Sequence, residues 1–331
     1  MYITSITLLS SMLLILSTLM AVSSSNWLCL WISMELNMFS FIPIMLNSKT
    51  NLECEAAVKY FINQAFASAL MIISSFLMWN KMNPFMLVIA PLLTLSILLK
   101  LGSSPCYMWF PSVMKAMSWA QSTILATWQK IAPMMIIFFN IKPLQIFMFA
   151  VVLMNIFIGG WLGMNQNNMR SLMAYSSIAH MGWMMAPYSI NMNVTATLYF
   201  FLYLLITLPI FIMMTYYSMN TPSNSNSLMK LPTFIQMSFM LMILSIAGLP
   251  PLSGFFPKLV VLFSMIQYSN IILLSMLLLS LMSLYFYLNI AFSVLVNSKQ
   301  TYSMNPNHNS NSILTYSTLS TIMLTPAIML L

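Results

Sequence analysis

Apolar runs of roughly 20 residues follow one another along almost the whole chain, and no other feature restricts the fold as strongly. A helix of that length spans a bilayer with all its backbone groups satisfied inside the segment. Charged residues make up 4% of the chain, against about a quarter of an ordinary soluble domain. The sequence therefore predicts an all-α, polytopic membrane protein, with residues 1–331 as a single integral membrane domain.

The apolar runs predict about eleven transmembrane helices, at 3–22, 26–46, 57–79, 84–103, 121–141, 144–163, 169–188, 194–217, 232–268, 270–295 and 313–331. The first run is followed by small residues, as in a secretory signal. Its start, "MYITS", carries no positive charge, and the run is long enough to span. We therefore expect a retained helix.

Cations in the expected loops are unequally divided between the two sides of the membrane. The side that holds the N-terminus collects Lys49, Lys59, Lys115, Arg170, Lys230 and Lys299, and the opposite side collects Lys81 and Lys142. Because positive loops stay inside, we expect the N-terminus in the matrix or cytoplasm and the C-terminus outside. The cations are scattered singly, which argues against nucleic acid as a partner despite the net charge of +8.

The cysteine content restricts the metal sites that the chain can hold, and the methionine content bears on the genome that encodes it. Cys29, Cys54 and Cys106 lie far apart, so they exclude a self-contained zinc or iron–sulfur site and are expected to be buried thiols. The 37 methionines exceed what packing demands. An AT-rich genome that reads an extra codon as Met, as animal mitochondria do, would produce this composition.

Apart from the cations counted with the loops, four charged residues lie inside the expected spans: Glu35, Lys100, Lys130 and Lys258. An ionised residue at the bilayer centre costs about 2.5–3.5 kcal/mol, so four cost roughly 10–14 kcal/mol, which equals a typical domain's net stability. Lys100 lies near a span end, where snorkelling is an alternative. Glu35 could instead lock two helices together. Lys130 lies in mid-span, which favours a functional role.

Two spans are expected to be discontinuous, near Lys130–Pro133 and near Gly248–Lys258. Proline lacks the amide hydrogen that would satisfy the carbonyl four residues earlier, and irregular backbone at membrane depth occurs beside protein or water. Broken helices with an ionisable residue at the break build ion sites in transporters. A buried lysine can take up and release a proton as a carboxylate approaches or withdraws. His180 is a further candidate for proton transfer, because histidine titrates near neutral pH. The alternative is that it is a hydrogen-bonded packing residue.

Several stretches resemble the subunit 2 family of mitochondrial NADH:ubiquinone oxidoreductase (complex I), which is antiporter-like and proton-translocating. They are "SSNWLCLWISMELNMFSFIPIM", "EAAVKYFINQAFAS", "LLKLGSSPCYMWFP", "TWQKIAP", "MNQNNMRSLMAYSSIAHMGW" and "AGLPPLSGFFPKL". The resemblance runs in order from about residue 1 to residue 290, with Met164 where the family usually has Leu. Tyr107 and Ser112 stand where family members commonly carry a His and an acid.

The resemblance implies a role for each candidate residue. Glu35 matches the membrane glutamate of the family, Lys100 the lysine that pairs with it, Lys130 the central lysine, Lys258 the lysine of the second broken helix, and His180 the histidine of the "HMGW" motif. Protons would pass from the Glu35–Lys100 pair to Lys130 and then to Lys258. No cofactor is implied in this chain, because other subunits would bind NADH, FMN, iron–sulfur clusters and ubiquinone.

The implied location is the mitochondrial inner membrane, with the N-terminus in the matrix and the C-terminus in the intermembrane space. The implied partners are other membrane-arm subunits and the lipid bilayer, cardiolipin included. Two alternatives stay open at this point: a stand-alone cation/proton antiporter, and a purely structural membrane subunit whose buried charges only join helices.

Overall fold

The computed structural model describes residues 5–48, 50–79, 86–141, 144–218, 233–268 and 270–298, and these residues form helices without any strand. The α-helices are α1 (Ser5–Ser23), α2 (Trp27–Met45), α3 (Asn51–Trp79), α4 (Met86–Leu101), α5 (Trp109–Ala116), α6 (Trp119–Ala126), α7 (Trp128–Asn140), α8 (Gln145–Met164), α9 (Met169–Ser189), α10 (Asn193–Ser218), α11 (Thr233–Ala247), α12 (Phe255–Ile266) and α13 (Asn270–Ser298). A short 3₁₀ turn, η1 (Leu46–Ser48), follows α2.

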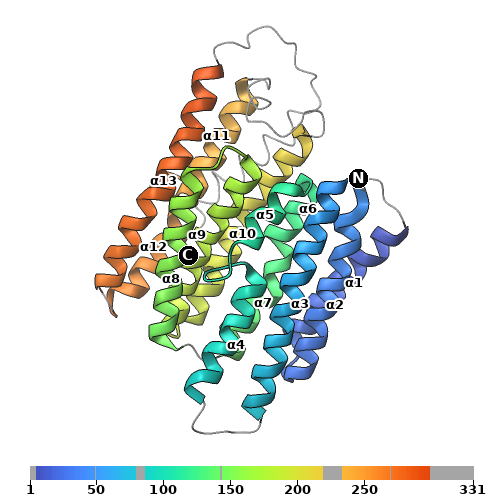
Figure 1. Cartoon of the computed structure of the whole chain (residues 1–331). Coiled ribbons are helices and arrows are strands. Elements are labelled where there is room, and N and C mark those ends of the chain that lie inside the picture. Colours follow the sequence, from blue (N-terminus) through green and yellow to red (C-terminus); the bar gives the residue numbers. More distant parts are fainter. Residues whose placement is uncertain are drawn as a thin grey trace.

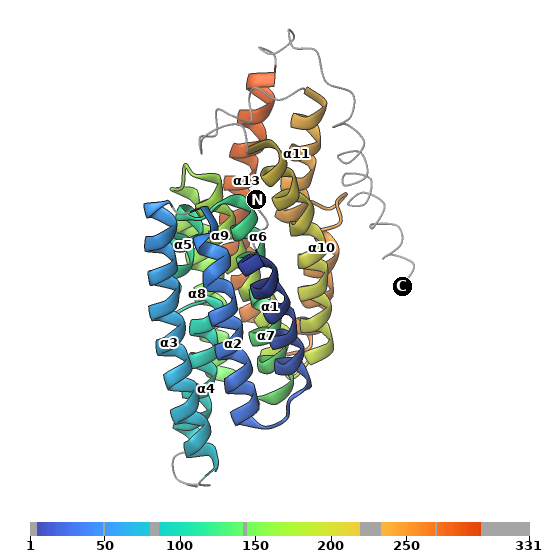
Figure 2. The ribbon, with the colours of Figure 1, turned by 90° about the vertical axis from the view of Figure 1, so that its right-hand side faces the viewer.

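The helices run side by side along one long axis (Figures 1 and 2). Figure 1 shows α1, α2 and α3 on one flank and α12 and α13 on the other, with α7, α9 and α10 between them. Within the described residues, seven segments are long and apolar enough to cross a membrane, and the paired helices α6 and α7 count as one of them. The prediction of an all-helical, multi-pass membrane protein is confirmed.

Each of the first ten predicted spans corresponds to a helix or to a broken pair of helices, and the eleventh, 313–331, lies outside the described residues. Two differences stand out. The short helix α5 falls between the fourth and fifth predicted spans. Helix α3 begins at Asn51, six residues earlier than predicted, so Glu53 lies in a helix and is 5% exposed.

The central helix α9 is the most deeply enclosed of the bundle, with buried residues along nearly its entire length. Glycines let α8 approach it closely. A Cβ atom added at Gly182 would lie 2.5 Å from Cγ1 of Ile156, and one added at Gly159 would lie 2.6 Å from the backbone nitrogen of Ala179. Small residues at such contacts are how membrane helices bring their backbones together. The polar side chains of α9 therefore face protein instead of lipid.

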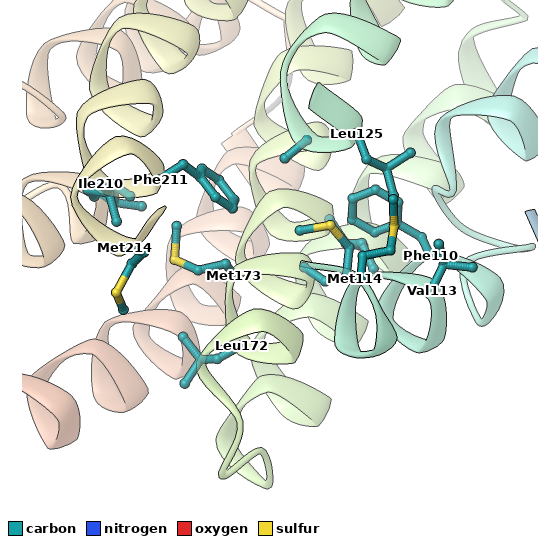
Figure 3. Packing of buried hydrophobic residues seen from close by; sticks show 14 of the residues in the cluster. Phe110, Val113, Met114, Leu125, Leu172, Met173, Ile210, Phe211 and Met214 are labelled. Carbon is teal, nitrogen blue, oxygen red and sulfur yellow. The ribbon is translucent and has the colours of Figure 1, made fainter. Parts of the chain in front are cut away.

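A large apolar cluster joins α5, α6, α9 and α10 at one end of the bundle. Figure 3 shows part of it, with Phe110 and Met114 near Leu125 on one side and Phe211 and Met214 on the other. This cluster fixes the short helix α5 against the central helices. It thereby holds Phe110 beside the buried lysine discussed below.

The expectation of buried thiols is wrong, because Cys29, Cys54 and Cys106 are all exposed. Cys29 and Cys54 lie on the outer helices α2 and α3. A thiol behaves as a small apolar group, and the outer face of a membrane bundle meets lipid instead of water. Burial inside the protein is therefore not needed to keep these side chains out of water.

Candidate functional site

Lys100 lies in the last turn of α4, where the helix is ended by Gly102. Gly102 has a φ of +67°, and its backbone nitrogen donates to the carbonyl of Leu99 at 3.2 Å, a helix ending that glycine favours. The amide nitrogen of Gln64 donates to the carbonyl of Lys100 at 3.0 Å. The side chain of Lys100 is 7% exposed, so the snorkelling alternative does not describe it.

Glu35, on α2, is half-buried and interacts electrostatically with Lys100. These two residues do not form an ion pair in the described part of the chain. The lysine is thus within the field of the carboxylate without being bound to it. Their pairing, which the family resemblance implies, stays a prediction.

Lys130 lies in the first turn of α7 and is 2% exposed. Its ammonium lies 4.9 Å from the ring centroid of Phe110 and 5.6 Å from that of Tyr203. Such cation–π contacts stabilise the charged form. None of the described carboxylates forms an ion pair with Lys130.

The helix interruption at Lys130 differs in place from the prediction. The break lies at Thr127, whose φ of −115° and ψ of −69° separate α6 from α7, while Pro133 lies inside α7. Pro133 removes one hydrogen bond, to the carbonyl of Gln129, and both residues line a cavity. The helix therefore continues through the proline.

The second interruption lies where the sequence predicts it, between α11 and α12. Gly248 follows the last residue of α11 with a φ of +79°. A Cβ atom at Gly254 would lie 1.7 Å from the carbonyl oxygen of Ser245, so the returning backbone passes very close to α11. Lys258, in the first turn of α12, donates from Nζ to the carbonyl of Ala247 at 2.7 Å.

His180 lies on α9 between the two breaks and is 8% exposed. Its Nδ1 shares a hydrogen bond of 3.0 Å with the hydroxyl of Tyr199. The imidazole is close enough to both Lys130 and Lys258 to interact with them electrostatically. The ammonium of Lys258 also lies 5.7 Å from the ring centroid of Trp183, one turn further along α9.

Two small cavities flank Lys130. The first has a volume of about 20 Å³ and is lined by both Lys100 and Lys130, together with Phe110. The second has a volume of about 10 Å³ and is lined by His180 and Tyr203, with Pro257 of the second break. Of the two rings that contact the Lys130 ammonium, that of Phe110 lines the first cavity and that of Tyr203 lines the second.

Glu35 interacts electrostatically with Lys100, one cavity is lined by both Lys100 and Lys130, and His180 interacts electrostatically with Lys130 and Lys258. Sequence reasoning missed the aromatic contacts of Phe110, Tyr203 and Tyr199, which come from distant segments without a shared motif. It also missed Glu53, which interacts electrostatically with Arg170.

Residues 24–283 match the family model described as "NADH:quinone oxidoreductase/Mrp antiporter, TM". The chain is 44% identical over 281 residues to NADH-ubiquinone oxidoreductase chain 2 of Lumbricus terrestris, covering 85% of this chain and 84% of the relative. The chain belongs to the NADH-ubiquinone oxidoreductase chain 2 family.

A second member of the chain 2 family, from Oryctolagus cuniculus, is 37% identical over 290 residues, covering 85% of this chain and 83% of the relative. Among solved structures, a chain of respiratory complex I from Thermus thermophilus superposes with a TM-score of 0.87 at 20% identity. The match covers 98% of this chain and 79% of that chain. The chain 2 family thus shares the antiporter-like fold that the broken helices indicate.

Proposed function

We propose that this chain is the proton-translocating subunit of the membrane arm of a respiratory NADH:ubiquinone oxidoreductase. It moves protons across the mitochondrial inner membrane while other subunits oxidise NADH and reduce ubiquinone. The chain 2 relatives, which match over 85% of this chain, support the assignment to that enzyme. Within that enzyme, we assign proton translocation to the buried ionisable residues of the candidate site.

The observation that carries the proposal is the position of Lys130. This cation is 2% exposed inside a membrane-spanning bundle, and none of the described carboxylates forms an ion pair with it. It instead lies between two aromatic rings that each border a cavity. A lysine in this position is suited to alternate between its charged and neutral forms, because burial favours the neutral form and the rings favour the charged one.

The proposed route begins at Glu35 and Lys100, continues to Lys130, and reaches Lys258 by way of His180. A proton that leaves Lys100 is accepted by neutral Lys130 through the first cavity. His180, which shares a hydrogen bond with Tyr199 and interacts with both lysines, supports transfer toward Lys258. Movement of Glu35 relative to Lys100 would set when Lys100 releases its proton.

The proposed orientation places the N-terminus in the matrix and the C-terminus in the intermembrane space. The guanidinium of Arg170 donates to the carbonyl of Met117 and interacts with Glu53. These contacts bring the start of α3, the α5–α6 connection and the start of α9 to one end of the bundle, where Lys59 and Lys115 also belong. That end is rich in cations, as the matrix side of a membrane protein is.

The proposed partners are the neighbouring membrane-arm subunits and the lipid bilayer, including cardiolipin. We assign the binding of NADH, FMN, iron–sulfur clusters and ubiquinone to other subunits of the enzyme. The large apolar side chains exposed on α1, α3 and α13 supply outer faces for lipid or for such subunits.

The test is Lys130→Met in the assembled enzyme, with proton translocation measured per NADH oxidised. The proposal expects coupled turnover and proton uptake to fall while the enzyme assembles. Normal pumping by the assembled variant would contradict it and favour the purely structural alternative. The stand-alone antiporter alternative makes a different prediction: the isolated chain in vesicles would exchange cations for protons without NADH.

A further inference from the structure

Asn155 is a fully buried polar residue in the middle of α8. Its Oδ1 accepts a hydrogen bond of 2.6 Å from the backbone nitrogen of Ser104, in the connection between α4 and α5. Because a backbone nitrogen can only donate, the oxygen of the amide must be the atom that faces Ser104. The Nδ2 atom has no hydrogen-bond partner among the described residues. Asn155 therefore contributes an acceptor to this contact, and its donor groups are not required for it.

The connection between α4 and α5, residues 102–108, leads directly into the first turn of α5, which carries Phe110. A Cβ atom added at Gly102 would lie 2.6 Å from Cβ of Phe110, so the connection folds back onto this residue. Nε1 of Trp109 also donates to the carbonyl of Leu99 at 3.1 Å, which joins the start of α5 to the end of α4. The position of the connection therefore determines where the Phe110 ring lies.

Asn155 also lies against α9. A Cβ atom added at Gly182 would lie 3.3 Å from Cβ of Asn155, and Gly182 follows His180 by two residues on the same helix. Polar side chains that hydrogen-bond between helices help to hold membrane bundles together. The hydrogen bond from Ser104 thus ties the α4–α5 connection to the closely packed pair α8 and α9.

We propose that Asn155 is a positioning residue, which holds the α4–α5 connection so that the Phe110 ring stays beside the ammonium of Lys130. The inference rests on the proposed function, because Lys130 is the central residue of the proposed route. The ring centroid lies 4.9 Å from the ammonium, and a cation–π contact extends to about 6 Å, so a displacement of about 1 Å brings the ring to that limit. Asn155 acts on Lys130 through Ser104 and Phe110.

Asn155→Leu and Asn155→Ala both remove the acceptor. Leucine approximately fills the volume of asparagine and alanine leaves it open, so the pair separates loss of the hydrogen bond from crowding. Each is expected to lower coupled turnover per assembled enzyme about tenfold, the loss that corresponds to weakening of the Phe110 contact. Asn155→Asp keeps an acceptor oxygen in either protonation state and loses only the Nδ2 donors, which have no described partner. It should keep turnover near that of the wild type.

A double variant tests whether Asn155 acts through Phe110. If the ring has already moved away from Lys130, removing the ring as well should cost little more. Asn155→Leu combined with Phe110→Leu should therefore lose about tenfold in turnover, like each single variant. Independent effects would multiply to a loss of about a hundredfold. A loss of that size would overturn the proposal, because a residue that only stabilises the bundle has no reason to share its effect with Phe110.

Val152→Ala is the control for lost packing, because Val152 is fully buried about one turn earlier on α8. Its turnover per assembled enzyme should stay near that of the wild type, and a loss equal to that in Asn155→Leu would overturn the proposal. Wild-type turnover in assembled Asn155→Leu and Asn155→Ala overturns it, and so does an equal loss in Asn155→Asp.

Assembly of Val152→Ala but of neither Asn155→Leu nor Asn155→Ala also overturns the proposal, because Asn155 would then serve folding. These outcomes leave the proposed function standing. That function fails on a separate result, normal pumping by assembled Lys130→Met.

Discussion

The ammonium of Lys258 is bound by the end of the helix that precedes it, through a 2.7 Å hydrogen bond to the carbonyl of Ala247. Ala247 is the last residue of α11, and the carbonyl end of a helix carries partial negative charge that favours a cation. The break between α11 and α12 thus leaves a helix end whose carbonyl binds Lys258, the lysine that follows the break. In the part of the chain that the structure describes, no carboxylate forms an ion pair with this ammonium.

Gly248→Ala is expected to displace Lys258 from this site. A Cβ atom at Gly248 would lie 2.9 Å from Nζ of Lys258, and the φ of +79° adds about 1–2 kcal/mol of strain for a residue other than glycine. Coupled proton translocation and thermal stability of the enzyme should both fall. The measurements are proton uptake per NADH and the temperature at which the complex dissociates.

Gly248→Asn separates the two effects. Asparagine tolerates positive φ better than alanine but still carries the Cβ atom that meets Lys258. It should therefore recover stability without recovering translocation. Full translocation by Gly248→Asn would show that crowding of Lys258 has no consequence.

Much of the fold is predictable from the sequence because bilayer thickness sets helix length. The break at Gly248 is also predictable, since two glycines and three prolines lie between Ala247 and Lys258. The break at Thr127 is not predictable in the same way, because a threonine in an apolar run does not oppose a helix locally. Pro133 suggests a break in the sequence, but it lies inside α7. The loss of a single hydrogen bond beside a cavity does not end a helix.

The candidate site likewise has residues that the sequence reveals and residues that it does not. The buried charges are visible in the sequence because an ionisable residue in an apolar run has a large cost. The groups that surround them are not visible, because Phe110 and Tyr203 reach Lys130 from segments 20 and 73 residues away in the chain. Aromatic residues are common in membrane helices, so neither one differs from its neighbours until the helices pack.

Phe110→Leu is expected to weaken the contact that favours charged Lys130. The ring lies 4.9 Å from the ammonium, and a desolvated cation–π contact contributes about 2 kcal/mol. Coupled turnover should fall by about tenfold or more, since 1.4 kcal/mol corresponds to a factor of ten. NADH-driven proton uptake in the assembled enzyme provides the measurement.

Phe138→Leu is the matched control for the loss of a buried ring. Phe138 is fully buried on the same helix as Lys130 and packs against Tyr188 instead of a cation. It should lower stability as Phe110→Leu does while leaving turnover per assembled enzyme near that of wild type. An equal loss of turnover in both variants would refute the cation–π role.

Gly182→Ala is expected to push α9 away from α8 and so to displace His180. The added Cβ atom would lie 2.5 Å from Cγ1 of Ile156 and 2.9 Å from the carbonyl oxygen of Val152. The first neighbour is a side chain and the second is backbone, so Ile156→Ala should relieve only part of the damage. Recovery of assembled enzyme on gels, for the single and double variants, checks this; full recovery in the double variant would show that the backbone contact is harmless.

Gln121→Leu is expected to loosen the junction between α6 and the end of α2. Nε2 of Gln121 donates to the carbonyls of Ile44 and Met45 at 3.1 and 2.9 Å, and its Oε1 accepts from the backbone nitrogen of Ser118 at 3.1 Å. Leucine removes all three hydrogen bonds, and each of the two buried carbonyls that loses its partner costs about 1–3 kcal/mol, so the dissociation temperature should fall.

Gln121→Glu tests which of these hydrogen bonds matters. A glutamate keeps the acceptor for Ser118, but an ionised carboxylate has no donor for the carbonyls of Ile44 and Met45 and repels them. If the junction with α2 dominates, Glu should destabilise the enzyme at least as much as Leu. If capping of α6 dominates, Glu should be close to wild type, because its carboxylate lies at the positive end of that helix. We expect the first result, since Gln121 is 2% exposed and its two bonds to α2 join segments more than 70 residues apart in the chain.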